Sequence, residues 1–222
     1  MLTAATLAMT FLVLAMILVE AQQRPRHWYG ALKIVASLLF VITGVVVVDD
    51  VPGVPGARPL FLAALLLSFV GDVALVPRGH KRIFQVGLVS FLLAHIVFIP
   101  AFAVRGIDVV ATAIVGAVML LPLIAVLRWL KRHVKGSMWG AVAAYVVVIS
   151  VMFSVAIGSV VAGTTSNVGV TPMLAIGALS FWLSDVTVAR ERFIAHSFIN
   201  RLLGIPLYFF AQLALIAGYQ LH

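Results

Sequence analysis

The sequence predicts an all-α membrane protein, a polytopic bundle of eight transmembrane helices. Of its 222 residues 64% are hydrophobic and only 10% are charged, whereas about a quarter of the residues of a soluble domain are charged. The apolar residues fall into stretches close to the ~20 residues that a spanning helix needs, and none alternates as barrel strands do. We therefore expect a single transmembrane domain over residues 1–222 and no soluble domain.

The apolar stretches follow one another along the whole chain. The first has no basic flank before it, so we expect a retained helix rather than a cleaved signal peptide. The third and seventh stretches have a proline at one end, Pro77 and Pro172, which favours helix boundaries there. The predicted helices cover residues 2–19, 31–48, 60–76, 84–104, 108–127, 138–162, 171–189 and 200–220.

The basic residues alternate along the chain, and this predicts its orientation. Most lie in or beside the loops that follow the first, third, fifth and seventh stretches, whereas the other loops hold only Arg58 and Arg105. By the positive-inside rule the basic loops are cytoplasmic and both termini are outside. The net charge of +8 thus reflects membrane topology, with some attraction for anionic lipid headgroups, and we expect no nucleic-acid partner. The basic residues are Arg24, Arg26, Lys33, Arg78, Lys81, Arg82, Arg128, Lys131, Arg132, Lys135, Arg190, Arg192 and Arg201.

Two carboxylates, Asp72 and Asp185, lie inside the predicted helices. Each is followed directly by Val and has Ser-Phe a few positions before it. An ionised carboxylate in hydrocarbon is costly, so an intramembrane Asp indicates a functional site with a partner. Both lie near a predicted cytoplasmic helix end, Asp72 about one turn or ~6 Å from it. The competing interpretation is structural, with each Asp paired to Lys33 or to loop arginines.

Other polar intramembrane residues gather in the same cytoplasmic half, which favours a cavity opening inward over a through-pore. Each has a competing structural interpretation: Lys33 can snorkel, a lone His can be a packing residue, and Tyr208 with Gln212 can form interhelical hydrogen bonds. A zinc site needs three or four clustered ligands, and the chain has no cysteine, so we expect no metal. These polar residues are Lys33, His95, Tyr145, Tyr208 and Gln212.

The two halves share a spacing. Tyr208 follows Asp185 at the interval at which His95 follows Asp72. The equal spacing is compatible with a parallel repeat of four helices. The alternative is that the halves look alike only because every helix that ends in the cytoplasm is followed by basic residues.

Three segments resemble the YhhN, or lysoplasmalogenase, family over about residues 30–218. Lys33 and the Tyr208, Ala211 and Gln212 set also match, whereas Phe98 stands where the family has an aromatic hydroxyl and Ile34 where it often has proline. The segments are Gly71-Asp72-Val73-Ala74-Leu75, residues 84–95 ending Leu93-Ala94-His95, and Gly177-Ala178-Leu179-Ser180-Phe181-Trp182-Leu183-Ser184-Asp185 with Ala189 and Phe193.

The resemblance implies an eight-helix integral membrane hydrolase. Animal members cleave the vinyl ether bond of lysoplasmalogens to a fatty aldehyde and glycerophosphocholine or glycerophosphoethanolamine, and no metal or organic cofactor is expected. The richness in Arg, Ala and Val favours a bacterial plasma membrane. The expected partners are a lysophospholipid substrate and the bilayer, and the sequence does not indicate an oligomeric state.

Vinyl ether hydrolysis needs one protonated acid and one anion near the developing cation, as two carboxylates in different environments provide. We expect Asp72 and Asp185 to be this pair, with the acid unassigned. Lys33 would keep one Asp ionised or hold the lipid phosphate, and His95 would position water or relay a proton. The candidate hydrogen-bond donors are Tyr145, Ser184, Tyr208 and Gln212.

Two other functions compete. A small proton-coupled transporter or channel would also use intramembrane Asp, His and Lys, but the polar residues do not continue into the outer half. The second competing function is the hydrolysis of a different lysolipid, because many bacteria lack plasmalogens. A structural protein without chemistry fits poorly with acids that are costly to bury unpaired.

Overall fold

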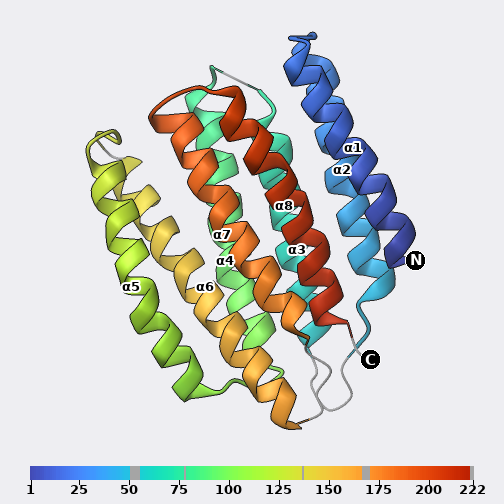
Figure 1. The fold of residues 1–222 in the computed structure, drawn as a ribbon, viewed down its shortest axis with the longest axis vertical. Coiled ribbons are helices and arrows are strands. Elements are labelled where there is room, and N and C mark those ends of the chain that lie inside the picture. The colour runs from blue at the N-terminus through green and yellow to red at the C-terminus, as the bar shows by residue number, and fades with distance from the viewer. Residues whose placement is uncertain (51–55, 78, 137, 167–170, 221–222) are drawn as a thin grey trace.

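The computed structural model describes residues 1–50, 56–77, 79–136, 138–166 and 171–220. In that part of the chain there are eight α-helices and no strand, and every helix is long and apolar enough to cross a membrane (Figure 1). The predicted eight-helix bundle is therefore confirmed, and the chain is an integral membrane protein. The helices are α1 (Leu2–Ala21), α2 (Arg26–Val47), α3 (Ala57–Leu75), α4 (Lys81–Ala103), α5 (Val109–Lys131), α6 (Met138–Ser166), α7 (Pro172–Phe193) and α8 (Phe198–Tyr219).

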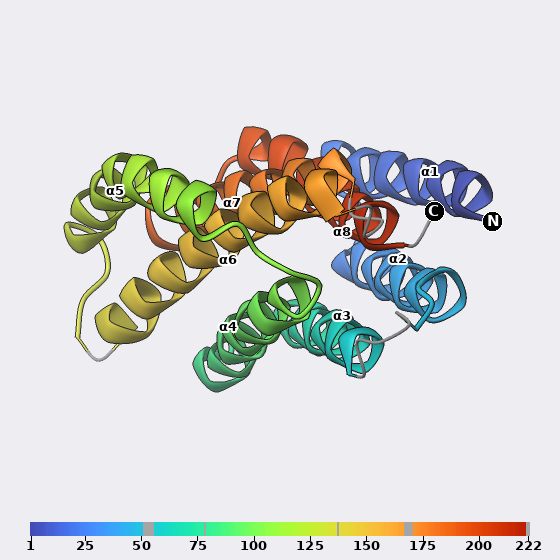
Figure 2. The same cartoon turned by 90° about the horizontal axis from the view of Figure 1, so that it is seen from below.

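Six of the helices close a ring. Going around it, α2 packs on α3, α3 on α4, α4 on α6, α6 on α7, α7 on α8, and α8 again on α2. The other two are peripheral: α1 packs on α2 and α8, and α5 packs on α6 and α7, so they form the two outer edges in Figure 2. In this ring order α3 stands opposite α7, and α2 stands opposite α6.

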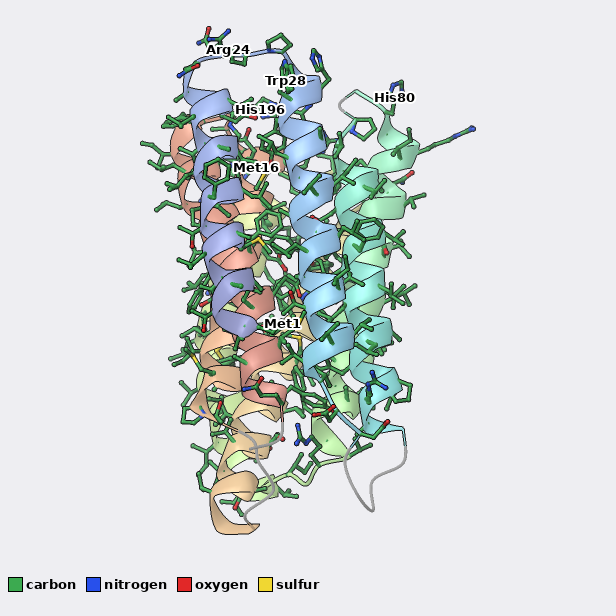
Figure 3. The ribbon with its side chains drawn as sticks, turned by 90° about the vertical axis from the view of Figure 1, so that its right-hand side faces the viewer. Met1, Met16, Arg24, Trp28, His80 and His196 are labelled. Atoms are coloured by element: carbon green, nitrogen blue, oxygen red, sulfur yellow. The ribbon has the colours of Figure 1, made fainter. Side chains whose placement is uncertain are left out.

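The loops predicted to be basic lie at one end of the bundle, which we call the basic end. The α1–α2, α3–α4, α5–α6 and α7–α8 connections are all at the top of Figure 1, and Figure 3 shows Arg24, Trp28, His80 and His196 at that end. Arg78, one of the basic residues of the α3–α4 loop, lies outside the described residues. The assignment of this end to the cytoplasm stays a prediction.

The helices extend past the apolar stretches at the basic end. Helix α2 begins at Arg26 and not at 31, and α7 ends at Phe193 and not at 189. Arg190, Glu191 and Arg192 are good helix formers, so the α7 backbone stays helical where the apolar run stops. Lys33 therefore lies about two turns inside α2, deeper than the expected boundary placed it.

The interior of the ring away from the basic end is filled by aromatic side chains. Phe61, Phe98, Phe102 and Tyr219 are fully buried, and the rings of Phe61 and Tyr219 stack with centroids 4.1 Å apart. Phe61 and Phe98 form an edge contact at 5.5 Å. Aromatic pairs in these geometries pack densely, so this half of the ring is a solid core.

Candidate functional site

A cavity of about 500 Å³ occupies the half of the ring nearer the basic end. All six ring helices and α5 contribute to its lining, and so do Gly79, His80 and His196 of the loops at that end. Asp72 and Asp185 both line it, although their helices stand on opposite sides of the ring. The two acids predicted to work together thus face a common space.

Asp72 is almost completely buried and has a partner on each oxygen. Its Oδ1 lies 3.0 Å from the Lys33 ammonium. Its Oδ2 accepts hydrogen bonds from the hydroxyls of Ser37 and Tyr208, both at 2.6 Å. A cation and two hydroxyl donors are what a buried carboxylate needs in order to stay ionised, and α2 and α8 supply them.

Asp185 has a sparser environment. Its Oδ2 accepts a hydrogen bond from the Tyr145 hydroxyl at 2.7 Å and lies 3.8 Å from Nε2 of His95. Within the described residues no hydrogen bond reaches its Oδ1 and no lysine or arginine lies within salt-bridge distance. The carboxyl group is partly exposed to the cavity, so its second oxygen is available to a bound molecule.

His95 is completely buried, and its environment fixes its tautomer. Nδ1 lies 2.6 Å from the Phe91 carbonyl oxygen, which can only accept, so Nδ1 carries the hydrogen. In the neutral ring Nε2 is then an acceptor, and it has no hydrogen-bond partner among the described residues. Its lone pair is directed toward the Asp185 side of the site.

Two aromatic rings that line the cavity, Phe91 and Tyr208, pack with a third, Phe181, where the cavity meets the aromatic core. Phe91, Phe181 and Tyr208 contact one another edge to face, with centroids between 5.4 and 6.3 Å apart. His95 packs against Phe181 on one side and Tyr145 on the other. These contacts hold the Tyr208 and Tyr145 hydroxyls toward the acids.

The remaining predicted residues lie around this centre. Ser184 borders the cavity, but its hydroxyl donates to the Gly204 carbonyl at 3.2 Å and so joins α7 to α8. Gln212 lies behind the site and donates to the Tyr208 hydroxyl at 3.2 Å. Across the described residues, no three His, Asp or Glu side chains come together as a metal site would require.

A model of the YhhN family matches residues 28–219. The chain belongs to the YhhN family. The family includes hydrolases, and membership is consistent with a function of the lysoplasmalogenase type. No curated protein and no solved structure matches the chain.

In this YhhN protein the two acids have corresponding partners from opposite halves of the chain. Asp72 of the first half is contacted by Tyr208 of the second, and Asp185 of the second by His95 of the first. The helix packing repeats in the same way, because α2–α3 and α3–α4 correspond to α6–α7 and α7–α8. The equal spacing of these residues in the sequence is thus matched by an arrangement about an axis along the bundle, as a parallel repeat would give.

Ser37, which donates to Asp72, was not among the residues predicted from the sequence. The signal was present, because Ser37 is four positions after Lys33 and residues at that spacing share a helix face. The ion pairs of Arg201, which lines the cavity of the YhhN protein, were also not predicted: it lies 3.2 Å from Glu20 and 3.7 Å from Glu191. Those contacts join α1, α7 and α8, and no pattern within one helix predicts them.

Proposed function

We propose that this protein hydrolyses the vinyl ether bond of a lysoplasmalogen, or of a closely related lysolipid, to a fatty aldehyde and a glycerophospho-alcohol. The proposal places it in the plasma membrane of a bacterium, with the basic end in the cytoplasm. The observation that carries it is the unequal environment of two carboxylates at one cavity. That inequality is what acid catalysis with two carboxylates requires.

Asp72 is assigned as the anion. The Lys33 ammonium at 3.0 Å and the hydroxyls of Ser37 and Tyr208 all stabilise its ionised form. Every one of these groups donates toward the carboxylate, so protonating Asp72 would disrupt the set. Its negative charge would stabilise the oxocarbenium-like cation that forms when the vinyl ether is protonated.

Asp185 is assigned as the general acid. Desolvation favours a neutral carboxyl group, and among the described residues no cation opposes this because neutral His95 offers only a lone pair. Tyr145 fixes Oδ2, which leaves Oδ1 on the cavity side to carry and deliver the proton. A positioned acid of this kind contributes roughly 10²–10⁴-fold to a rate.

The reaction balances with water as the only co-reactant. The Asp185 proton adds to the β-carbon of the vinyl ether, and the electron pair of the double bond forms the new C–H bond. Water then attacks the cationic α-carbon and returns a proton to the Asp185 carboxylate, which gives a hemiacetal. The hemiacetal expels the glycerol oxygen, which takes the hydroxyl proton, and the products are an aldehyde and an alcohol.

The aromatic core argues against the competing transporter or channel. A transport path would continue from the acids to the opposite end of the bundle. Beyond Phe91, Phe181 and Tyr208, the described interior is occupied by the stacked rings of Phe61, Phe98, Phe102 and Tyr219. The cavity therefore fits a substrate that enters and leaves at the basic end.

The decisive experiment measures aldehyde release. Purified protein in detergent is given lysoplasmalogen, and fatty aldehyde is followed with a coupled dehydrogenase. We expect turnover in the wild type, and a loss of at least about 10²-fold in Asp72→Asn and in Asp185→Asn. In deuterated water the product should carry one deuterium at the carbon next to the aldehyde. No aldehyde from well-folded wild-type protein would overturn the proposal.

The division of roles has its own test. A small carboxylic acid such as formate can replace a missing general acid if the side chain is shortened, so formate should restore part of the activity of Asp185→Gly. Chloride, an anion with no proton to deliver, should restore part of the activity of Asp72→Gly, where Lys33, Ser37 and Tyr208 remain in place to hold an anion. Chloride should restore none of the activity of Asp185→Gly. The opposite result with chloride would reverse the assignment.

A further inference from the structure

The charged and the apolar side chains that line the cavity come from different helices. Every charged side chain in it comes from α2, α3, α7, α8 or the loops at the basic end, and none comes from α4, α5 or α6 within the described residues. On those three helices the hydroxyl of Tyr145 is the one polar side-chain group. Their lining residues are Phe84, Leu88, Phe91, Val126, Leu130, Val142, Tyr145, Val146 and Ile149.

Part of this lining packs separately from the main core. Leu130, Val142 and Val146, together with Val134, form a hydrophobic cluster of their own, and Leu88 and Val126 pack against it at partial exposure. The cluster joins α5 to α6 near the basic end. We call Leu88, Val126, Leu130, Val142, Val146 and Ile149 the apolar wall.

The opposite side of the ring carries hydrogen-bond donors and cations. Arg26 and Lys33 of α2 and Asn200 and Arg201 of α8 line the cavity there, and α2 stands opposite α6 in the ring. The acids belong to α3 and α7, which lie between these two sides. A molecule with one polar end and one apolar end, placed with its reactive bond at the acids, therefore has a single orientation that matches both sides.

We propose that the apolar wall binds the aliphatic chain of a single-chain lipid, whose phosphate-bearing end faces α2 and α8, and that the wall limits the length of that chain. This inference rests on the proposed function. The vinyl ether joins the polar glycerol to the chain, so a bond held at Asp72 and Asp185 directs the two parts to opposite sides. The cavity volume of about 500 Å³ is within the roughly 300–1,000 Å³ of pockets that hold one small ligand.

The apolar wall makes chain length the property to measure. Each methylene that leaves water for the apolar wall strengthens binding until the wall is covered. A bulky residue in the wall should shorten the chain that fits without affecting the acids. Val146 is suitable because it is 8% exposed and borders the cavity, whereas its neighbour Val147 is 41% exposed and faces away from the bundle.

The experiment compares Val146→Trp with the matched control Val147→Trp on alkenyl lysolipids of increasing chain length. For long chains we expect kcat/KM of Val146→Trp to fall by about tenfold or more, since a misfitting methylene in an apolar pocket has that effect. The loss in Val146→Trp should become smaller as the chain shortens, and Val147→Trp should keep the wild-type profile. An equal loss at every length, or an unchanged profile in Val146→Trp, would overturn the inference.

A binding measurement separates this inference from the proposed reaction. Saturated alkyl ether lysophospholipids contain no vinyl ether bond, and their binding to protein in nanodiscs can be followed by displacement of a fluorescent lysophospholipid. We expect affinity to rise with chain length in the wild type and Val147→Trp, and to stop rising at a shorter length in Val146→Trp. If Val146→Trp shows this shift but no protein releases aldehyde, the apolar wall binds the lipid chain and the proposed reaction is wrong. If affinity depends on chain length in the same way in all three proteins, the apolar wall does not bind the chain.

Discussion

Two aspartates in similar sequence contexts acquire different properties from their neighbours on other helices. Asp72 meets a lysine and a serine from α2, whereas Asp185 meets a tyrosine from α6, the helix opposite α2. In the proposed mechanism these partners, and not the acids themselves, separate the anion from the general acid. The chemistry would then be decided by residues one layer away from the reacting atoms.

At this scale Lys33 gives a sharp prediction. Lys33→Met leaves Asp72 buried without its cation, and breaking a buried pair in this way destabilises a protein by about 3–5 kcal/mol. We expect a lower melting temperature and a strong loss of activity. The measurement is thermal unfolding in detergent together with aldehyde release.

The double variant Lys33→Met/Asp72→Asn distinguishes pairing from catalysis. Removing the charge of Asp72 as well eliminates the unpaired carboxylate, so the melting temperature should recover most of the loss. Activity should stay absent, because the anion is gone. Recovery of activity in the double variant, or a single Lys33→Met variant as stable as the wild type, would contradict the role given to this pair.

At the scale of helices, α7 and α8 form a close pair whose contact depends on glycine. A Cβ on Gly218 would lie 2.1 Å from the Leu174 backbone nitrogen, and one on Gly177 would lie 2.8 Å from the Leu215 nitrogen. Small residues allow membrane helices to approach closely and pack by van der Waals contact. This approach matters for the site, because α7 carries Asp185 and α8 carries Tyr208.

Gly218→Ala should push α7 and α8 apart. We expect a destabilisation of about 1–3 kcal/mol, the usual cost of overpacking a close contact, seen as a lower melting temperature in detergent. Gly140→Ala is the matched control, because a Cβ at that helical position meets nothing within 4 Å. Equal melting temperatures for the two variants would show that the pair does not depend on this contact.

The helices and most of the polar residues around the acids were predictable, but the helix ends and the pairing of each acid with its own partners were largely not. A spanning helix is identified by its apolar length alone, which locates all eight. Apolar length does not identify the polar turns at a helix end. The predicted start of α2 at residue 31 was therefore wrong, because the helix begins at Arg26. The pairing of Asp72 with Lys33 was one of the predicted alternatives, and Ser37 lies one turn further along the same face of α2. The division of the cavity into polar and apolar sides depends instead on the ring order. No sequence period reports that order.

At the scale of the whole molecule, the two halves of the chain form related halves of one ring. Opposite positions in the ring are occupied by α2 and α6, α3 and α7, and α4 and α8. Helices in corresponding positions run in the same direction, as in a parallel repeat about an axis along the membrane normal. Both acids consequently lie nearer the same end, and one cavity serves both. The corresponding positions differ chemically where α2 supplies Lys33 and α6 supplies Tyr145.

The orientation of the bundle in the membrane is the last prediction. If the basic loops are cytoplasmic, then the α4–α5 loop, at the opposite end, faces outward. The chain has no cysteine, so single cysteines can be introduced at the exposed positions Ile107, in that loop, and His133, at the basic end. In intact cells a membrane-impermeant maleimide should label Ile107→Cys and should label His133→Cys only after the cells are opened. The reverse pattern would place the basic end outside, and under the proposed function the lysolipid would then enter from the outer leaflet.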